Sequence, residues 1–397
     1  MKKKFFYGML LTLVAGATIT LASCSKDDDN GSSGQLVVSI PSDAQATPNP
    51  TLPEDANTSI PNLNYTVETE NGQKVVRFDL TGIQDPATLN EWLYLYGTAK
   101  PGQNIWVEID QAAKGFTVHN TIDDANQTGK QSLVDLVFLV DNSGSMDQEA
   151  DTIAKDIVDW SKALAKTLNM RFGCVGYDVS GYVNGALDFN DADSLGRYLD
   201  RPGHNYWGTD RTMGYDDDAL KDAAYTFSHR ADSLGRVWDE NGVMALRFAH
   251  ENFSFRAGAN RVYVNFTDEP NQPNNNTEWS VEWAKDTKNW ATTYGTVHTV
   301  FSEDTAYYRN YWRDLYYEKP WLLSDYTGGT TIFTSSDFKD VSLASLPITG
   351  ALQNSYYIRL TNVDNLFDGQ DHKVKITILS PDKKVRAERE FNVVFQQ

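Results

Sequence analysis

Positive charge, cysteine and the common hydrolase motifs are all scarce in this sequence of 397 residues. It carries 35 lysines and arginines against 54 aspartates and glutamates, which gives a formal net charge of −19. That excess of negative charge argues against binding nucleic acid through its phosphates, and against docking on an anionic membrane surface. Neither an HExxH nor a GxSxG motif occurs, so a zinc protease or an α/β-hydrolase has no support.

What the sequence does have is enough apolar material for a folded core. Hydrophobic residues make up 40% of the chain and aromatic residues 12%. The length exceeds that of one ordinary domain and leaves room for two. An acidic surface on such a protein suits divalent cations, or serves solubility alone.

The N-terminus has the composition of an export signal. Three lysines, Lys2–Lys4, precede an apolar run from Phe5 to Leu21, which is too short and too interrupted to be a spanning helix. The run ends in Leu21-Ala22-Ser23-Cys24, which resembles the lipobox of bacterial lipoproteins. The resemblance implies cleavage before Cys24 and lipid attached to that cysteine. A plain secretory signal with a chance cysteine is the alternative.

The residues after the lipobox bear on location and on disulfides. Ser25-Lys26-Asp27-Asp28-Asp29 resembles the acidic signal that sends some Gram-negative lipoproteins to the cell surface, so we expect a surface-exposed outer-membrane lipoprotein. With only two cysteines in the chain, a lipidated Cys24 leaves Cys174 alone. No intrachain disulfide or cysteine metal site is then possible. Cys174 lies in an apolar run and is expected to be a small core residue.

Short alternating runs near both ends of the chain indicate β-structure. From Leu63 the pattern alternates around Asn71-Gly72, a strong hairpin turn signal. The expected strands beyond that hairpin are Asn104–Ile109 and Phe116–His119, and then, near the C-terminus, Tyr356–Leu360, Lys373–Leu379 and Ala387–Phe395.

Between these two regions the sequence pattern predicts strands that alternate with helices. Apart from Asp135, the run VDLVFLV is continuously apolar, as a strand covered on both faces is expected to be. The expected helices are Asp147–Asn169, Asp193–Leu199, Asp217–Ser228, Gly242–Phe255, Trp279–Thr293 and Leu343–Leu352. The strands between them are Arg171–Tyr177, Gly185–Phe189, Arg261–Thr267, Thr296–Phe301 and Thr330–Phe333. This alternation predicts a mostly parallel, doubly wound sheet.

The predicted fold class is therefore α/β, with that sheet inserted in or flanked by an all-β, sandwich-like domain. Two separate small β units are the alternative to a shared one. The predicted boundaries are 1–23 for the signal, 24–62 for a flexible tether, 63–132 for the first β part, 133–353 for the α/β domain and 354–397 for the second β part.

Oxygen-bearing side chains follow the predicted central strands. Ligands of an open parallel sheet bind beyond the carboxyl ends of its strands. Asp141, Ser143 and Ser145 come after the first such strand, and Asp268 comes after another. Oxygen ligands with few carboxylates suit Mg²⁺, which retains waters that a partner's carboxylate can replace. A simpler role for Ser145 is to cap a helix that begins near Met146.

Two motifs carry a family resemblance. DNSGSM after VFLV, and FTDE after RVYVN, resemble the von Willebrand factor type A (VWA) domain. That family binds a cation at a metal-ion-dependent adhesion site. The resemblance implies that Asp141, Ser143 and Ser145 match its DxSxS motif, and that Asp268 matches its second-loop aspartate. It covers about Leu133 to Leu352, and ALRFAHENFSFRAGANRVYVNFTDEPNQP resembles a bacterial surface-lipoprotein branch of the family.

The threonine that completes the family's site is ambiguous here. Thr209 and Thr212 follow the short helix, as the family order requires, and Thr209 is the first choice. The loop directly before the helix at Gly242 contains no threonine, so Glu240 or Asp239 is the alternative ligand. An added carboxylate would shift the preference toward Ca²⁺.

The sequence also has an aromatic segment that follows the strand ending at Phe301. It is expected to form either a rim that binds sugar or protein, or the core of an insertion. Its members are Tyr307, Tyr308, Tyr311, Trp312, Tyr316, Tyr317 and Trp321.

Taken together, these patterns predict a lipid-anchored surface protein for binding or adhesion. It would capture an acidic group on a protein or glycan through a divalent cation, Mg²⁺ first, with Ca²⁺ and Mn²⁺ as alternatives. Its only membrane contact would be the lipid. A scaffold subunit of a surface uptake or pilus-like assembly is one alternative. A metal-dependent hydrolase is another, but no general base is identifiable, so we predict that the protein is not an enzyme.

Overall fold

Residues Ser39–Gln397 form one compact unit of the computed structural model. The structure describes residues 39–61, 63–88, 91–121, 133–147, 150–178, 183–199, 226, 240–303, 305, 317–336, 338, 342–345 and 347–396. The predicted signal, Cys24 and residues 24–38 of the predicted tether lie outside these ranges. Positions 39–61 of the tether are described: this part is irregular apart from the 3-10 turn Asp43–Gln45, and it bonds the β-sheets, as where Asn49 N donates to Glu108 Oε1 at 2.9 Å. No helix within the described ranges is long and apolar enough to cross a membrane.

A six-stranded sheet forms the centre of the α/β region, in the order β11-β10-β9-β6-β7-β8. Its pairs are parallel except for β7 with β8, so the prediction of a mostly parallel sheet is confirmed. The strands are β6 (Leu133–Asp141), β7 (Asn169–Tyr177), β8 (Val183–Asn190), β9 (Asn260–Thr267), β10 (Thr296–Phe301) and β11 (Thr331–Phe333).

The middle of strand β6, from Leu136 to Val140, is apolar because helices cover both faces of the sheet. Leu136 and Phe138 pack into one hydrophobic cluster with residues of α2, α3 and α7. Val137 and Leu139 point the other way, into a cluster with residues of α5 and α6. The helices are α2 (Ala150–Leu164), α3 (Ala192–Leu199), α5 (Gly242–Asn252), α6 (Leu322–Thr327) and α7 (Pro347–Gln353).

The predicted helix Asp217–Ser228 lies outside the described residues except for position 226, and one predicted helix within the described ranges is wrong. The segment expected to be helical from Trp279 to Thr293 contains two short 3-10 turns, η5 (Val281–Lys285) and η6 (Thr292–Tyr294). Asp286 ends the first turn, because its carboxylate accepts from the backbone of Lys288, and this local bond competes with helix hydrogen bonds. Trp290 is then fixed by a bond from its indole to Gly295 O.

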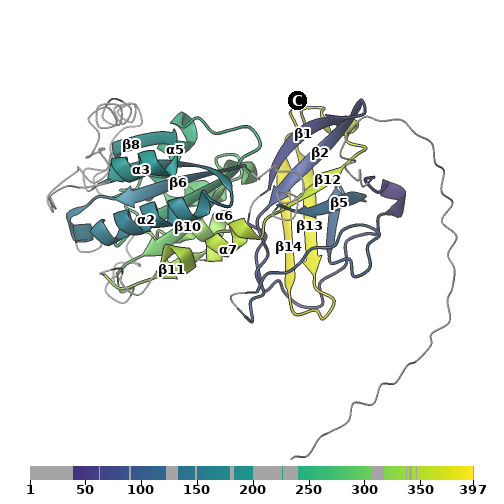
Figure 1. Ribbon diagram of the computed structural model, residues 1–397, viewed down its shortest axis with the longest axis horizontal. Coiled ribbons are helices and arrows are strands. Elements are labelled where there is room, and N and C mark those ends of the chain that lie inside the picture. The colour runs from purple at the N-terminus through teal and green to yellow at the C-terminus, as the bar shows by residue number, and fades with distance from the viewer. Residues whose placement is uncertain are drawn as a thin grey trace, which may run out of the picture. The chain divides into compact units, whose positions relative to one another are not determined.

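Two four-stranded antiparallel sheets are built from both ends of the chain, in the orders β1-β2-β12-β5 and β14-β13-β3-β4. Inward residues of both sheets share one hydrophobic cluster. In Figure 1, purple β1 and β2 accordingly accompany yellow β13 and β14. The strands are β1 (Asn64–Glu70), β2 (Gln73–Leu80), β3 (Ile105–Ile109), β4 (Ala112–Ala113), β5 (Phe116–Asn120), β12 (Tyr356–Leu360), β13 (His372–Leu379) and β14 (Arg386–Val393).

The turn between β1 and β2 follows from its two residues. Asn71 and Gly72 have φ angles of 52° and 78°. A type I′ hairpin turn needs positive φ at both central positions, which Asn and Gly tolerate best. The predicted hairpin is confirmed, and its seven residue pairs run in register from Asn64–Asp79 to Glu70–Gln73.

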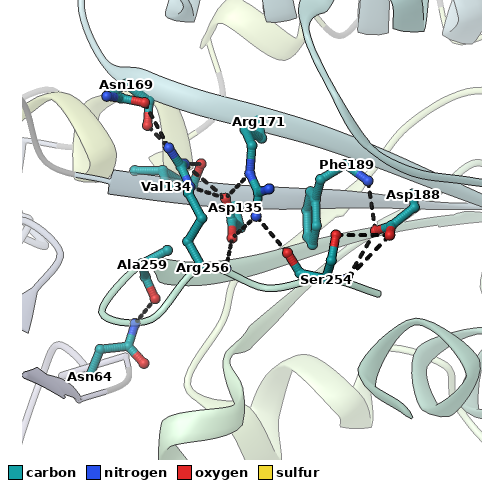
Figure 2. A network of polar contacts seen from close by, with 10 residues as sticks. All are labelled: Asn64, Val134, Asp135, Asn169, Arg171, Asp188, Phe189, Ser254, Arg256 and Ala259. Carbon is teal, nitrogen blue, oxygen red and sulfur yellow. Dashed lines mark hydrogen bonds and ion pairs between the residues drawn. The ribbon is translucent and has the colours of Figure 1, made fainter. Parts of the chain in front are cut away.

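A buried ion cluster lies at the amino end of β6 (Figure 2). Asp135 is fully buried and accepts from the guanidinium groups of Arg171 and Arg256, with ion-pair distances of 2.9 and 2.8 Å. Arg256 also donates to Val134 O and Asn169 O, so it fastens the segment after α5 to the ends of two strands. The same segment accepts a bond from Asn64 Nδ2 at Ala259 O.

Replacing Asp135 should therefore be costly. In Asp135→Ala we expect the free energy of unfolding to fall by about 3 kcal/mol, because two guanidinium groups lose their buried partner. The exposed pair Lys155–Asp159 supplies the control, and Asp159→Ala should cost about 0.5 kcal/mol or less. Urea denaturation of both variants measures the difference, and equal losses would contradict the assigned role.

A histidine clamp joins two loops of the antiparallel sheets. His372 Nδ1 lies 2.7 Å from Asp110 Oδ2, and its Nε2 lies 3.0 Å from Asp368 Oδ1. Burial lowers the pKa of His372, but the hydrogen bonds to Asp110 and Asp368 outweigh it, so the net shift is upward. The hydrogen bond with His372 also lowers the pKa of Asp110.

The clamp should make stability depend on pH. A raised folded-state pKa means that the stabilisation by His372 is complete below the ordinary value of 6.5 and is lost as the pH rises through the folded value. We expect His372→Gln to lower the urea midpoint more at about pH 5.5 than at about pH 9, where both proteins carry a neutral side chain. A gap that widens toward high pH would contradict this assignment.

Candidate metal centre

The predicted site lies where the chain direction changes in the sheet. From β6 the chain adds β7 and β8 on one side, and β9, β10 and β11 on the other. The carboxyl ends of β6 and β9 are therefore neighbours at the switch point, where open α/β sheets leave a crevice for ligands. The pairing of β6 with β9 extends to Val140–Phe266, just before Asp141 and Thr267.

Four of the predicted site residues come together there. Ser143 Oγ lies 2.8 Å from Ser145 Oγ, and Ser145 Oγ donates to Asp268 Oδ1 at 3.0 Å. Asp141 is bound to the same loop, because its Oδ1 accepts from the backbone of Ser143 at 2.9 Å. The helix-cap role for Ser145 is wrong, since this residue lies inside the 3-10 turn η2 (Gly144–Asp147) and its hydroxyl bonds Asp268 instead.

Thr267 fixes the second oxygen of Asp141, a role that sequence reasoning did not assign. Its hydroxyl donates to Asp141 Oδ2 at 2.8 Å and accepts from the backbone of Glu269 at 3.1 Å. On the other side of β6, Asn142 N donates to Tyr177 O at 2.6 Å. The only sequence signal for Thr267 was its place immediately before Asp268.

Tyr177, whose hydroxyl is influenced by Asp141, keeps a neutral phenol. Burial raises the pKa of Tyr177 well above its ordinary value, and the negative charges of Asp141 and Glu240 raise it further. The protonated hydroxyl donates to Asn265 Oδ1 at 2.9 Å. Tyr177 is therefore a protonated hydrogen-bond donor to Asn265.

The donor set fits a hard divalent cation such as Mg²⁺. Adjacent oxygens around octahedral Mg²⁺, with bonds of about 2.1 Å, lie about 3 Å apart, and Ca²⁺ with its longer bonds needs a wider spacing. The oxygens of Ser143, Ser145 and Asp268 lie 2.8 and 3.0 Å apart because they hydrogen-bond to one another, and this places them close enough to be neighbouring ligands of one ion. Among the described residues, no group of three or more His, Cys, Asp or Glu could hold a metal, so hydroxyl oxygens would have to take part.

Of the four candidates for the remaining ligand position, the structure describes only Glu240. Thr209, Thr212 and Asp239 lie outside the described residues. Glu240 is buried at the start of α5, where its Oε2 accepts from Gln272 Nε2 at 3.0 Å. The same amide lies 3.3 Å from Glu269 Oε2, so Gln272 links the start of α5 to the loop that carries Asp268.

Most of the aromatic segment also lies outside the described residues. Its last member, Trp321, packs edge-on against Phe301 and Phe333, with ring centroids 5.1 and 5.0 Å apart. Phe333 is 52% exposed at the end of the edge strand β11. This end of the segment thus packs against the sheet edge.

No family model matches the chain, and no curated protein matches it. Similar solved structures include the conserved hypothetical protein BatB from Bacteroides thetaiotaomicron, at 13% identity over 54% of this chain and 97% of that one, with a TM-score of 0.32. Another is the PilB minor pilin from Streptococcus sanguinis, at 14% identity, 74% and 75% coverage, and a TM-score of 0.31.

A third is the vWF domain of the type V pili tip protein Mfa5 from Porphyromonas gingivalis. It is 16% identical over 36% of this chain and 40% of that one, with a TM-score of 0.19. The function proposed below therefore rests on the residues of this chain.

The hydrogen bond from Thr267 gives a direct test of the site. In Thr267→Val we expect the Mg²⁺ affinity to fall about tenfold, because Asp141 loses the hydroxyl that orients it. Thr69→Val, an isosteric change at an exposed position of β1, should leave the affinity unchanged. Isothermal titration with MgCl₂ measures both, and an unchanged affinity in Thr267→Val would remove the residue from the site.

Proposed function

We propose that this protein is a lipid-anchored, cell-surface binding or adhesion protein of the VWA type. It captures an acidic group on a protein or glycan ligand through a divalent cation, preferably Mg²⁺, held at the carboxyl ends of β6 and β9. The outer-membrane location rests on the lipobox resemblance around Cys24.

One observation carries this proposal: two serine hydroxyls and two aspartates from separate strands share one hydrogen-bonded cluster at the switch point. Hydroxyls contribute no negative charge, so a cation held by Ser143 and Ser145 keeps much of its attraction for an outside carboxylate. Asp141 and Asp268 supply the charge that retains it. Ser145 is exposed, while Asp141, Ser143 and Asp268 are buried, so a ligand approaches past Ser145.

Each residue then has a definite task. Ser143 and Ser145 present neutral oxygens, and Asp141 anchors the loop through the backbone of Ser143. Thr267 orients Asp141, and Thr209, or else Thr212 or Glu240, completes the set. When bound, the cation supplies a positive charge that a foreign carboxylate can bind.

Binding is favoured over hydrolysis by the state of the nearby acid–base groups. Asp141 accepts two hydrogen bonds, and Asp268 accepts the one from Ser145. The phenol of Tyr177 is held neutral by its raised pKa. These groups are arranged to hold an ion, and we propose no catalytic role for them.

Capture from a cell-surface extract tests the proposal. Wild-type protein on beads should retain a ligand in MgCl₂ and release it in EDTA, and an oligoglutamate peptide should compete because it offers carboxylates. Asp141→Ala should lose at least about tenfold in capture, while Asp193→Ala, which removes an exposed carboxylate of α3, should not.

The alternatives give different results in the same assay. Capture that survives both EDTA and Asp141→Ala would overturn the metal-bridged mechanism. Metal-dependent retention of a subunit of the protein's own surface assembly would favour the scaffold role. Turnover of a hydrolase substrate panel that is lost in Asp141→Ala would favour the enzyme.

A further inference from the structure

A cleft lies beside α5, and it shares no residue with the candidate metal centre. It has a volume of about 780 Å³, within the range of small-ligand sites. Arg247 of α5 forms one wall, and the segment from Thr277 to Asn289 forms the other. This is the segment that folds into 3-10 turns where a helix was predicted, so its backbone turns several polar side chains toward one space.

Planar side chains pack together at one side of the cleft. The guanidinium of Arg247 lies 4.5 Å from the ring centre of Trp279 and 4.8 Å from that of Trp283. Its Nη1 donates to Glu278 O at 3.0 Å, which fixes the plane. Trp279 is buried, whereas Trp283 is partly exposed and lines the cleft. The aromatic surface is therefore formed before any ligand arrives, which lowers the entropy cost of binding.

Hydrogen-bond donors and acceptors both surround that aromatic surface. Asp286 and Glu278 offer acceptor oxygens, and Lys288 and Asn289 offer donors. Lys288 makes no ion pair with any described residue. Asp286 is exposed, and the hydrogen bond that it accepts from Lys288 N sets its position.

This lining excludes several ligand classes. A lipid tail would leave the charged side chains unpaired. A phosphate would face the carboxylates of Glu278, Glu282 and Asp286, and a cationic peptide would face Arg247 and Lys288. A neutral polyol suits the mixture, because each hydroxyl donates and accepts and one face of a sugar ring is apolar enough to lie on an indole.

We propose that this cleft binds an uncharged hexose or N-acetylhexosamine unit of a glycan. The sugar ring packs against the exposed part of Trp283, which also contacts the guanidinium of Arg247 and the ring of Trp290. Its hydroxyls bond Asp286 and Glu278 on one side and Lys288 and Asn289 on the other. The site is independent of the cation, so the protein has two separate recognition sites in its α/β region.

Saturation-transfer NMR and calorimetry on the full chain test this, with the methyl glycosides of glucose, galactose, mannose and N-acetylglucosamine as probes. At least one glycoside should bind saturably, with equal affinity in MgCl₂ and EDTA. Trp283→Ala and Asp286→Ala should each weaken it by about tenfold. Asp286 is exposed, so its variant remains informative if Trp283→Ala fails to fold.

Controls separate this site from the metal centre. Trp321→Ala, which removes an indole outside the cleft, and Asp141→Ala should both bind the sugar like wild type. The proposal is overturned if no glycoside binds, if binding survives Asp286→Ala, or if it disappears in EDTA. Binding of an oligolysine peptide in place of every sugar would likewise overturn it.

Discussion

The parallel pairing of β6 with β9 is the constraint on which the rest of the α/β region depends. These two strands lie side by side at the centre of the sheet, with β7 and β8 on one side and β10 and β11 on the other. Their apolar residues fill clusters on both faces, so a shift of one residue would turn buried Leu136 and Phe138 toward the wrong helices. Because that register is fixed by burial, Asp141 and the residues that follow β9 meet at one edge.

Strand β6 has a carboxylate near each end, and the two have opposite environments. Asp135 is fully buried and saturated by two arginines, and so it serves to hold the segment after α5. Asp141 lies about 20 Å further along, at the usual rise of about 3.3 Å per residue, and its neighbours are hydroxyls and a backbone amide.

The segment after β9 connects the two proposed sites. It leaves Asp268, passes through Asn271 and Gln272, whose side chains bond neighbouring elements, and then forms the wall of the cleft. Asn241 caps α5 and donates to Trp279 O, so the start of α5 is tied to the same wall. Metal centre and cleft thus share one framework while using different side chains.

Four features could be predicted from the sequence: the apolar central strands, the mostly parallel sheet, the Asn71-Gly72 hairpin and the oxygen-bearing residues after β6. These depend on local patterns: continuous burial, alternation, turn chemistry and the position of a strand end. The predicted helix at 279–293 is wrong. Its apolar residues have helical spacing, but the hydrogen bond that Asp286 accepts from the backbone of Lys288 and the bond from the Trp290 indole to Gly295 O hold the segment in another conformation.

Which distant side chains meet became clear only from the three-dimensional structure. It brought the hydroxyl of Ser145 to Asp268, gave Thr267 the task of orienting Asp141, and set Arg247 against Trp279 and Trp283. It also placed Asp110 and Asp368 on either side of His372. The physical reason is that such contacts depend on strand order and register, which arise from packing across the whole core and leave no signal in any short stretch of sequence.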